Sequence, residues 1–193
     1  MEYRRRRFFF SFVVLLLLLG LGLALVWTVK NQGWWEKSTR IAQSQPGFYS
    51  VIRISDGDTI TVNMNGNLEE IRFIGVDTPE THDPRKPVQC YGQEAADYTK
   101  KLLVGQKVRL QADSLNTNRD RYNRLLRYVY LADGSLIEAK LIAEGYGFAY
   151  TLFPFEKASE FLSYEHLAKQ TGRGLWAACQ VTETERAKQT NPI

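Results

Sequence analysis

The chain has 193 residues and a formal net charge of +4, a length that allows one domain with an appended segment or two small domains. Residues 1–45 carry a net charge of +5 and residues 46–193 a net charge of −1, which excludes a uniformly basic nucleic-acid-binding domain. Contact with phosphate must therefore come from a local basic cluster, and the sequence offers one in Arg119, Arg121, Arg124 and Arg127.

The N-terminal segment predicts a membrane anchor. Phe8–Val29 holds 22 residues without a charge, and a helix of that length, about 33 Å, spans a hydrocarbon core. Arginines at positions 4–7 precede it, and the positive-inside rule keeps such residues in the cytoplasm. A cleaved signal peptide is the alternative, but its apolar region is usually shorter and ends at a small-residue site that is absent here. Under either interpretation the rest of the chain is exported.

The predicted organisation is a cytoplasmic tail over 1–7, a transmembrane signal anchor over 8–29, a polar linker over 30–45, a domain over 46–180 and a C-terminal tail over 181–193. Within the domain, alternating apolar residues, turn signals and the Asn65-Gly66 hairpin signal indicate mainly strands. The fold class is α+β, mainly β: a small barrel of about five strands with about three helices packed outside. The predicted strands are Phe48–Ile54, Thr59–Met64, Leu68–Val76, Lys107–Ala112, Arg124–Leu131 and the short Phe148–Leu152; the predicted helices are Tyr91–Val104, Leu136–Glu144 and Ala158–Gln170.

Two cysteines, Cys90 and Cys179, are present. A zinc site needs three or four Cys or His ligands at characteristic spacing, and the chain has only two histidines. In an oxidising compartment we expect one disulfide between the two cysteines. Two unrelated buried thiols are the alternative.

The chemistry available to the domain rests on carboxylates and arginines, because the sequence has neither a Gly-rich phosphate loop nor a G-x-S-x-G elbow. Asp58 ends a D-G-D turn, and Asp77 and Glu80 follow a strand about twenty residues later. Two carboxylates with a backbone carbonyl and waters suit Ca²⁺, and a third carboxylate can act as general base. Arg72 and Arg124 can hold a phosphate from two sides.

These residues together predict a phosphodiesterase site built without histidine. Each motif has a plainer interpretation when it is taken alone. D-G-D is commonly a solvated turn, "DTPE" is commonly a loop or the start of a helix, and Arg72 could form a strand-edge ion pair. Their occurrence in this order favours the catalytic interpretation.

The ordered motifs resemble the staphylococcal nuclease (thermonuclease) family, over roughly residues 50–176. The motifs that carry the resemblance are "DGDTI" (Asp56–Ile60), "IRFIGVDTPE" (Ile71–Glu80), "YGQEA" (Tyr91–Ala95), "DRYNRLL" (Asp120–Leu126), "LADGSLI" (Leu131–Ile137) and "GRGLW" (Gly172–Trp176). The resemblance implies an OB-type five-stranded barrel with three helices. It also implies Ca²⁺-dependent hydrolysis of DNA and RNA that leaves 3′-phosphates.

Carried over by position, the resemblance assigns a role to each candidate site residue. It makes the carboxylates of Asp58 and Asp77 and the carbonyl of Thr78 the Ca²⁺ ligands, and Glu80 the general base. The implied phosphate clamps are Arg72 and Arg124, and the implied substrate contacts are Tyr122 and Arg121.

The chain departs from the family pattern at Asn123, where the family usually has Gly, and at Glu138, where it commonly has Asn. Asn tolerates left-handed backbone angles, so we expect the turn before Arg124 to survive. The expected protein is a membrane-anchored or secreted monomeric endonuclease whose partners are DNA, RNA and the membrane. The alternative is a catalytically inactive OB-type module that binds nucleic acid or protein while tethered to the membrane.

Overall fold

The computed structural model describes residues 47–81, 87–184 and 187–193. The predicted cytoplasmic tail, signal anchor and linker lie outside these residues. Within them, every helix is too short or too polar to cross a membrane.

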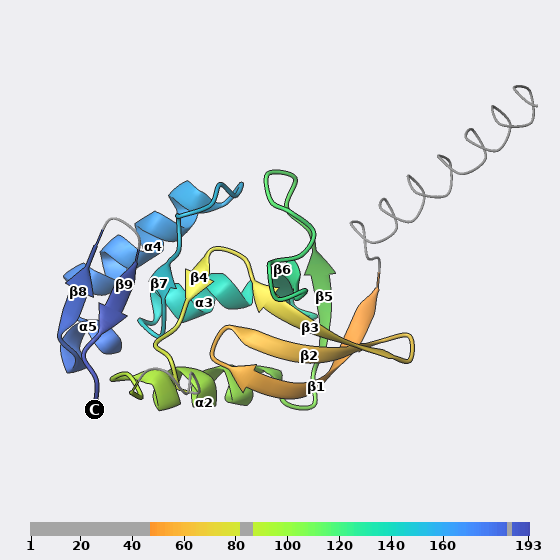
Figure 1. The fold of residues 1–193 in the computed structure, drawn as a ribbon, viewed down its shortest axis with the longest axis horizontal. Helices are drawn as coiled ribbons and strands as arrows, with labels where there is room; N and C mark the ends of the chain where they lie inside the picture. Colours follow the sequence, from red (N-terminus) through yellow and green to blue (C-terminus); the bar gives the residue numbers. More distant parts are fainter. Residues whose placement is uncertain (1–46, 82–86, 185–186) are drawn as a thin grey trace, which may run out of the picture. The chain divides into compact units, whose positions relative to one another are not determined.

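Five strands close into a barrel in the order β1-β2-β3-β6-β5 (Figure 1). All neighbouring strands are antiparallel except β3 and β6, which run parallel, and the β1–β5 pair closes the barrel. The predicted five-stranded barrel is therefore confirmed. The strands are β1 (Phe48–Asp56), β2 (Thr59–Met64), β3 (Asn67–Phe73), β5 (Lys107–Gln111) and β6 (Leu125–Tyr130).

Apolar side chains from alternate strand positions fill the barrel. Ile60, Ile71 and Leu125 are fully or almost fully buried, as expected for residues that share one face of a pleated sheet. Arg72 lies between two such core residues, Ile71 and Phe73, and its register partners are Thr59 on β2 and Leu126 on β6. This register places the arginine beside the start of β2.

The strand predicted over Leu68–Val76 is wrong in its C-terminal part. The structure ends β3 at Phe73, turns at Gly75 with a φ of +72°, and begins a separate strand, β4 (Val76–Asp77). β4 pairs with β7 (Phe148–Ala149) outside the barrel. A Cβ at Gly75 would lie 2.5 Å from the Phe155 ring, so the bend depends on a residue far along the chain.

The helices lie outside the barrel (Figure 1). α2 (Gly92–Leu103) packs against β1, and α3 (Ile137–Ala143) contacts both β6 and α4 (Ala158–Gln170). These are the three predicted helices, and the described residues add a short fourth, α5 (Leu175–Ala178). After α5, β8 (Val181–Glu183) and β9 (Lys188–Thr190) pair as antiparallel strands. Both lie within residues 181–193, the predicted C-terminal tail.

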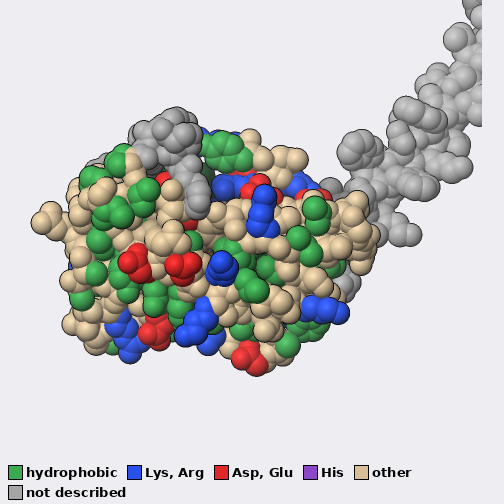
Figure 2. Space-filling view, turned by 90° about the horizontal axis from the view of Figure 1, so that it is seen from below, with side chains coloured by type: hydrophobic (Ala, Val, Ile, Leu, Met, Phe, Trp, Pro, Cys, Tyr) green, Lys and Arg blue, Asp and Glu red, His purple; other side chains and the backbone are tan. Residues whose placement is uncertain are grey.

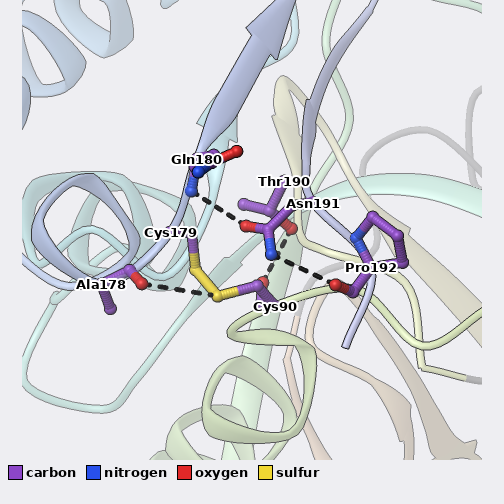
Figure 3. Close-up of a disulfide and its surroundings, with 7 residues drawn as sticks. All are labelled: Cys90, Ala178, Cys179, Gln180, Thr190, Asn191 and Pro192. Atoms are coloured by element: carbon purple, nitrogen blue, oxygen red, sulfur yellow. Dashed lines mark hydrogen bonds between the residues drawn. A yellow bond between two sulfur atoms is a disulfide. The ribbon is translucent and has the colours of Figure 1, made fainter.

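The predicted disulfide is present: Cys90 and Cys179 are bonded and their Cα atoms are 5.9 Å apart (Figure 3). The bond joins the residue two positions before α2 to the end of α5. It therefore ties the chain just after the "DTPE" loop to the C-terminal region.

Glu138, one of the two departures from the family pattern, is a fully buried carboxylate on α3. Both of its carboxylate oxygens accept a hydrogen bond from the backbone N–H of Val129, at 3.1 and 3.2 Å. Burial raises the pKa of Glu138 well above its usual range, although hydrogen bonds from backbone N–H groups, including its own and that of Val129, oppose the rise. The folded chain therefore binds this proton more tightly than the unfolded chain does.

We expect Glu138→Gln to stabilise the protein relative to wild type by an amount that increases with pH. A raised carboxyl pKa contributes stability at acidic pH, and this contribution is lost as pH rises above the value of a free glutamate, about 4.3. Glutamine has no such loss. Melting temperatures of both proteins across the acidic to alkaline range test this, and parallel curves would contradict it.

Candidate active site

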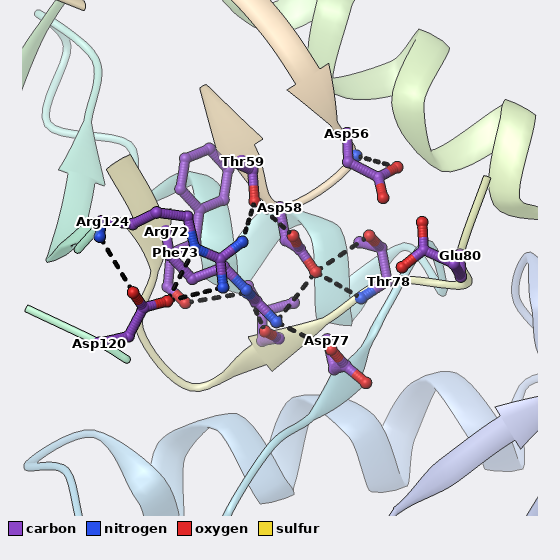
Figure 4. A network of polar contacts seen from close by, with 12 residues as sticks. Asp56, Asp58, Thr59, Arg72, Phe73, Asp77, Thr78, Glu80, Asp120 and Arg124 are labelled. Atoms are coloured by element: carbon purple, nitrogen blue, oxygen red, sulfur yellow. Dashed lines mark hydrogen bonds and ion pairs between the residues drawn. The ribbon is translucent and has the colours of Figure 1, made fainter. Parts of the chain in front are cut away.

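The candidate residues meet at one end of the barrel (Figure 4). Asp58 ends the β1–β2 turn, Arg72 lies on β3, Asp77 ends β4, Glu80 follows three residues later and Arg124 immediately precedes β6. The β3–β4 bend brings Asp77 back toward the β1–β2 turn. The structure thus brings together residues that lie up to 66 positions apart in the sequence.

Arg72 is the most highly connected of these side chains. Its Nη2 lies 2.8 Å from a carboxylate oxygen of Asp77 and 3.1 Å from one of Asp58. Its Nη1 donates to the carbonyl oxygens of Val76, at 2.7 Å, and Phe73, at 3.2 Å. Burial alone would lower the pKa of Arg72, but the two carboxylates outweigh it and raise that pKa. The guanidinium is therefore permanently charged and fixed in direction.

Asp58 is buried, with its carboxylate held by neighbouring donors. One oxygen accepts the Thr78 N–H at 3.0 Å and the Thr78 hydroxyl at 3.2 Å, and the other accepts the Thr59 hydroxyl at 2.9 Å. The side chain of Asp77 is more open, with 37% of its surface exposed. One carboxylate of the pair is thus rigid and the other faces solvent.

Negative charge accumulates beside this pair. Asp56 accepts a hydrogen bond from the Thr81 hydroxyl at 3.0 Å, which brings the "DTPE" loop against the β1–β2 turn. Burial first, and then the charges of Asp58 and Glu80, raise the pKa of Asp56 to about 7. Asp56 therefore lies in a buried, negatively charged environment beside the Asp58–Asp77 pair.

The donor chemistry of the cluster fits a hard cation such as Ca²⁺, which takes carboxylate and carbonyl oxygens. Among the described residues, no three carboxylate, imidazole or thiol side chains are grouped closely enough to hold a metal by themselves. Such an ion would therefore also need backbone carbonyls and waters as ligands, as the sequence-based hypothesis already supposes.

Arg124 approaches the site from the side opposite Thr78. Its Nε and Nη2 both lie 2.7 Å from the same Asp120 oxygen, and its Nη1 lies 3.5 Å from the Thr59 hydroxyl. Asn123, just before it, has a φ of +66°. The left-handed angle expected at this departure from the family pattern is therefore confirmed.

The predicted substrate contacts lie on the loop before Arg124. The Tyr122 ring is 57% exposed, and the guanidinium carbons of Arg121 and Arg124 lie 4.8 and 5.3 Å from its centroid. Arg121 also donates to the Tyr122 hydroxyl at 2.7 Å. An exposed aromatic residue beside two cations suits a nucleobase next to a phosphate.

The four-arginine cluster predicted from the sequence does not form a single surface. Arg119 pairs with Glu69 at 2.9 Å, and Arg127 is fully buried with its Nη2 2.6 Å from the Asn118 side-chain oxygen. Burial, followed by the charge of Arg119, lowers the pKa of Arg127 to about 10. On the face shown in Figure 2, basic and acidic side chains are interspersed.

The sequence-based prediction missed three polar residues at the site. Asp56 is the first carboxylate of the D-G-D turn, and Asp120 lies four positions before Arg124, so both had a local signal. Tyr150, just after β7, had none. Tyr150 follows Ala149, which pairs with Val76 of β4, and the Tyr150 N–H donates to the Gly75 carbonyl at 2.9 Å. Burial first, and then the charge of Asp77, raise the pKa of Tyr150, while Arg72 and Arg121 oppose the rise.

The close approach of the Thr78 side chain explains why the D-G-D turn has glycine at position 57. A Cβ at this position would lie 2.7 Å from the Thr78 hydroxyl oxygen and 2.9 Å from its Cβ. We expect Gly57→Ala to push Thr78 away from Asp58 and to destabilise the protein by about 1–3 kcal/mol, as overpacking does. Thermal denaturation tests this, and an unchanged melting temperature would mean that the turn can yield.

Comparisons with known proteins agree with this geometry. Residues 70–178 match the family model described as "Staphylococcal nuclease homologue". The chain is 41% identical to the thermonuclease of Staphylococcus hyicus, over 73% of this chain and 82% of that protein. It is 48% identical to the thermonuclease of Staphylococcus intermedius, over 50% and 56% of the two chains. It is 39% identical to the endonuclease YncB of Bacillus subtilis, over 65% and 59%. The chain belongs to the staphylococcal nuclease family.

Proposed function

We propose that the chain is an exported, Ca²⁺-dependent endonuclease that hydrolyses phosphodiester bonds of DNA and RNA and leaves 3′-phosphates. One observation carries the proposal: at one end of the barrel the Arg72 guanidinium pairs with Asp58 and Asp77, and the Arg124 guanidinium reaches the Thr59 hydroxyl that donates to Asp58 (Figure 4). Membership of the staphylococcal nuclease family and the names of the relatives support a nuclease.

The metal-binding role falls to the carboxylates of Asp58 and Asp77 and the backbone carbonyl of Thr78. A bound Ca²⁺ would supply positive charge to a phosphate oxygen. Asp58, whose two oxygens are both held by donors, would give such an ion a rigid ligand, and the more exposed Asp77 could adjust to it.

The remaining side chains divide the hydrolysis between them. Glu80 takes a proton from the attacking water as general base, because it is the carboxylate of the "DTPE" loop that is not assigned as a metal ligand. Arg72 and Arg124 bind the phosphate oxygens and stabilise the charge that builds up as the water attacks. Tyr122 and Arg121 hold the neighbouring nucleotide.

The experiment is a digestion of single-stranded DNA, duplex DNA and RNA by the purified full-length chain, with Ca²⁺, with Mg²⁺ or with excess chelator. We expect cleavage with Ca²⁺, little with Mg²⁺, which demands tighter octahedral geometry, and none with chelator. Binding of nucleic acid without cleavage under all three conditions would favour the inactive-module alternative instead.

Export and anchoring form a separate prediction, which rests on the uncharged run at 8–29 and the arginines before it. We expect the chain to fractionate with membranes and protease added to intact cells to release the domain. Immunoblots of membrane, soluble and protease-released fractions test this. Recovery of the whole chain, N-terminus included, from the soluble cytoplasm would contradict it.

A further inference from the structure

Glu80 lies three residues after β4, outside any helix or strand, and one residue, Gln89, binds both the N–H and the carbonyl of its backbone. The side-chain oxygen of Gln89 accepts the Glu80 N–H at 2.8 Å, and the Gln89 N–H donates to the Glu80 carbonyl at 2.9 Å. These two hydrogen bonds, together called the clasp, fix the backbone of Glu80 and therefore the point from which its side chain projects.

Gln89 is in turn held by the C-terminal end of the chain, the strap formed by residues 190–193. The Cys90 N–H donates to the Asn191 carbonyl at 2.8 Å, and Gln89 forms a β-bridge with Pro192. The Thr190 hydroxyl donates to the Cys90 carbonyl at 2.7 Å. The Cys90–Cys179 disulfide also links the residue after Gln89 covalently to the end of α5 (Figure 3).

The strap is fixed to the body of the domain. Lys188, on β9, pairs with the buried Glu165 of α4 at 2.5 Å. The other oxygen of Glu165 accepts the N–H of Ala149 at 3.0 Å, and Ala149 belongs to the β7 strand that pairs with β4. A continuous set of contacts thus runs from the two-stranded β4–β7 sheet through α4, β9 and the strap to Gln89.

We propose that Gln89 is a positioning residue for Glu80, and that the C-terminal strap and the Cys90–Cys179 disulfide keep Gln89 in place. The inference rests on the proposed function, in which Glu80 is the general base. It makes the rate of cleavage depend on a covalent bond outside the active site. A dithiol reductant would transfer two electrons and two protons to the disulfide, giving two thiols and the oxidised cyclic reagent, and would free Cys90, the residue after Gln89, from Cys179.

The first test compares the full-length wild type with three variants. Gln89→Met keeps the length of the side chain but removes the acceptor, and Gln89→Glu keeps an acceptor oxygen. Gln93→Met makes the same change as the first at an exposed position of α2 and serves as the matched control.

A displacement of about 1 Å at a catalytic group can cost about 10²-fold in rate. We expect Gln89→Met to lower kcat by about ten- to a hundredfold with KM within about twofold of wild type. Gln89→Glu should recover most of this loss, and Gln93→Met should match wild type. Equal kcat values for Gln89→Met and Gln93→Met would overturn the proposal.

The second test is a cycle of substitution and reduction. Dithiothreitol should lower kcat of the wild type severalfold while near-UV circular dichroism at the assay temperature stays native. It should have little further effect on Gln89→Met, whose clasp is already lost. Equal losses in both proteins would overturn the link between the disulfide and Gln89. If Glu80→Gln itself cleaves normally, the assignment of Glu80 as general base fails, and if the wild type does not cleave with Ca²⁺ the proposed function fails, so these failures are distinguishable from that of the Gln89 proposal.

Discussion

Glu80→Gln is expected to lower kcat by about 10²–10⁴, the range typical of general acid–base catalysis, with little change in KM. Glutamine has the size of glutamate and can still accept the Thr81 N–H, which lies 3.0 Å from a Glu80 oxygen. It cannot take a proton from water. The substitution therefore removes the proposed chemistry and preserves the local structure.

The measurement is steady-state cleavage of a labelled oligonucleotide in saturating Ca²⁺. Glu70→Gln is the matched control, because Glu70 is an exposed residue of β3 and has no assigned role in the site. The control should cleave at the wild-type rate. If Glu80→Gln does so too, the general base lies elsewhere and Glu80 has a structural role.

Arg72→Lys is expected to lower kcat/KM by about 10²–10³, comparable with the loss of one donor that stabilises developing charge. The two terminal nitrogens of Arg72 serve different partners: Nη1 donates to Val76 and Phe73, and Nη2 pairs with Asp77 and Asp58. A single ammonium cannot reproduce that fork or bind a phosphate with two parallel hydrogen bonds.

Arg53→Lys, at an exposed position of β1, is the control for this change. Kinetics of both variants should be read beside their melting temperatures, because Arg72 also offsets the charge of two carboxylates. A variant that is destabilised yet cleaves at the wild-type kcat/KM would show that Arg72 supports the fold and does not contact the phosphate.

Local sequence signals were sufficient to predict most of the barrel. Thr59–Met64 alternates as a strand should, and the Asn65-Gly66 turn has the positive φ values, +54° and +94°, that a two-residue hairpin requires. The break in the strand after Phe73 was not predictable in this way. It depends on the Phe155 ring, which fills the space beside Gly75, and that contact spans eighty positions of the sequence.

The C-terminal hairpin shows the same limit. The sequence "VTETERAKQT" is polar, and the sequence-based organisation places it in a C-terminal tail. The structure forms β8 and β9 there because the disulfide and the Lys188–Glu165 pair hold the segment against the domain. Tertiary contacts decide the conformation where local propensity is weak.

The site was predictable as a set of residues but not as an electrostatic arrangement. The order of the motifs indicated Asp58, Arg72 and Glu80. That Arg72 pairs with both Asp58 and Asp77, and that Asp120 fixes Arg124, follows from the packing of β3, β4 and the loop before β6. The four-residue spacing of Asp120 and Arg124 is a local signal, whereas the pairing of Arg72 with Asp58 and Asp77 has no sequence signal beyond the presence of opposite charges.

The most direct test of the proposed function is the chemistry of the product ends. A 5′-labelled oligonucleotide is digested by the full-length chain with Ca²⁺, and the fragments are treated with a phosphatase that removes 3′-phosphates. Glu80→Gln purified in the same way controls for contaminating nucleases. The account predicts fragments whose mobility shifts after phosphatase treatment, formed by wild type and suppressed by chelator and in Glu80→Gln. Fragments with 3′-hydroxyl ends, or full cleavage in excess chelator, would contradict it.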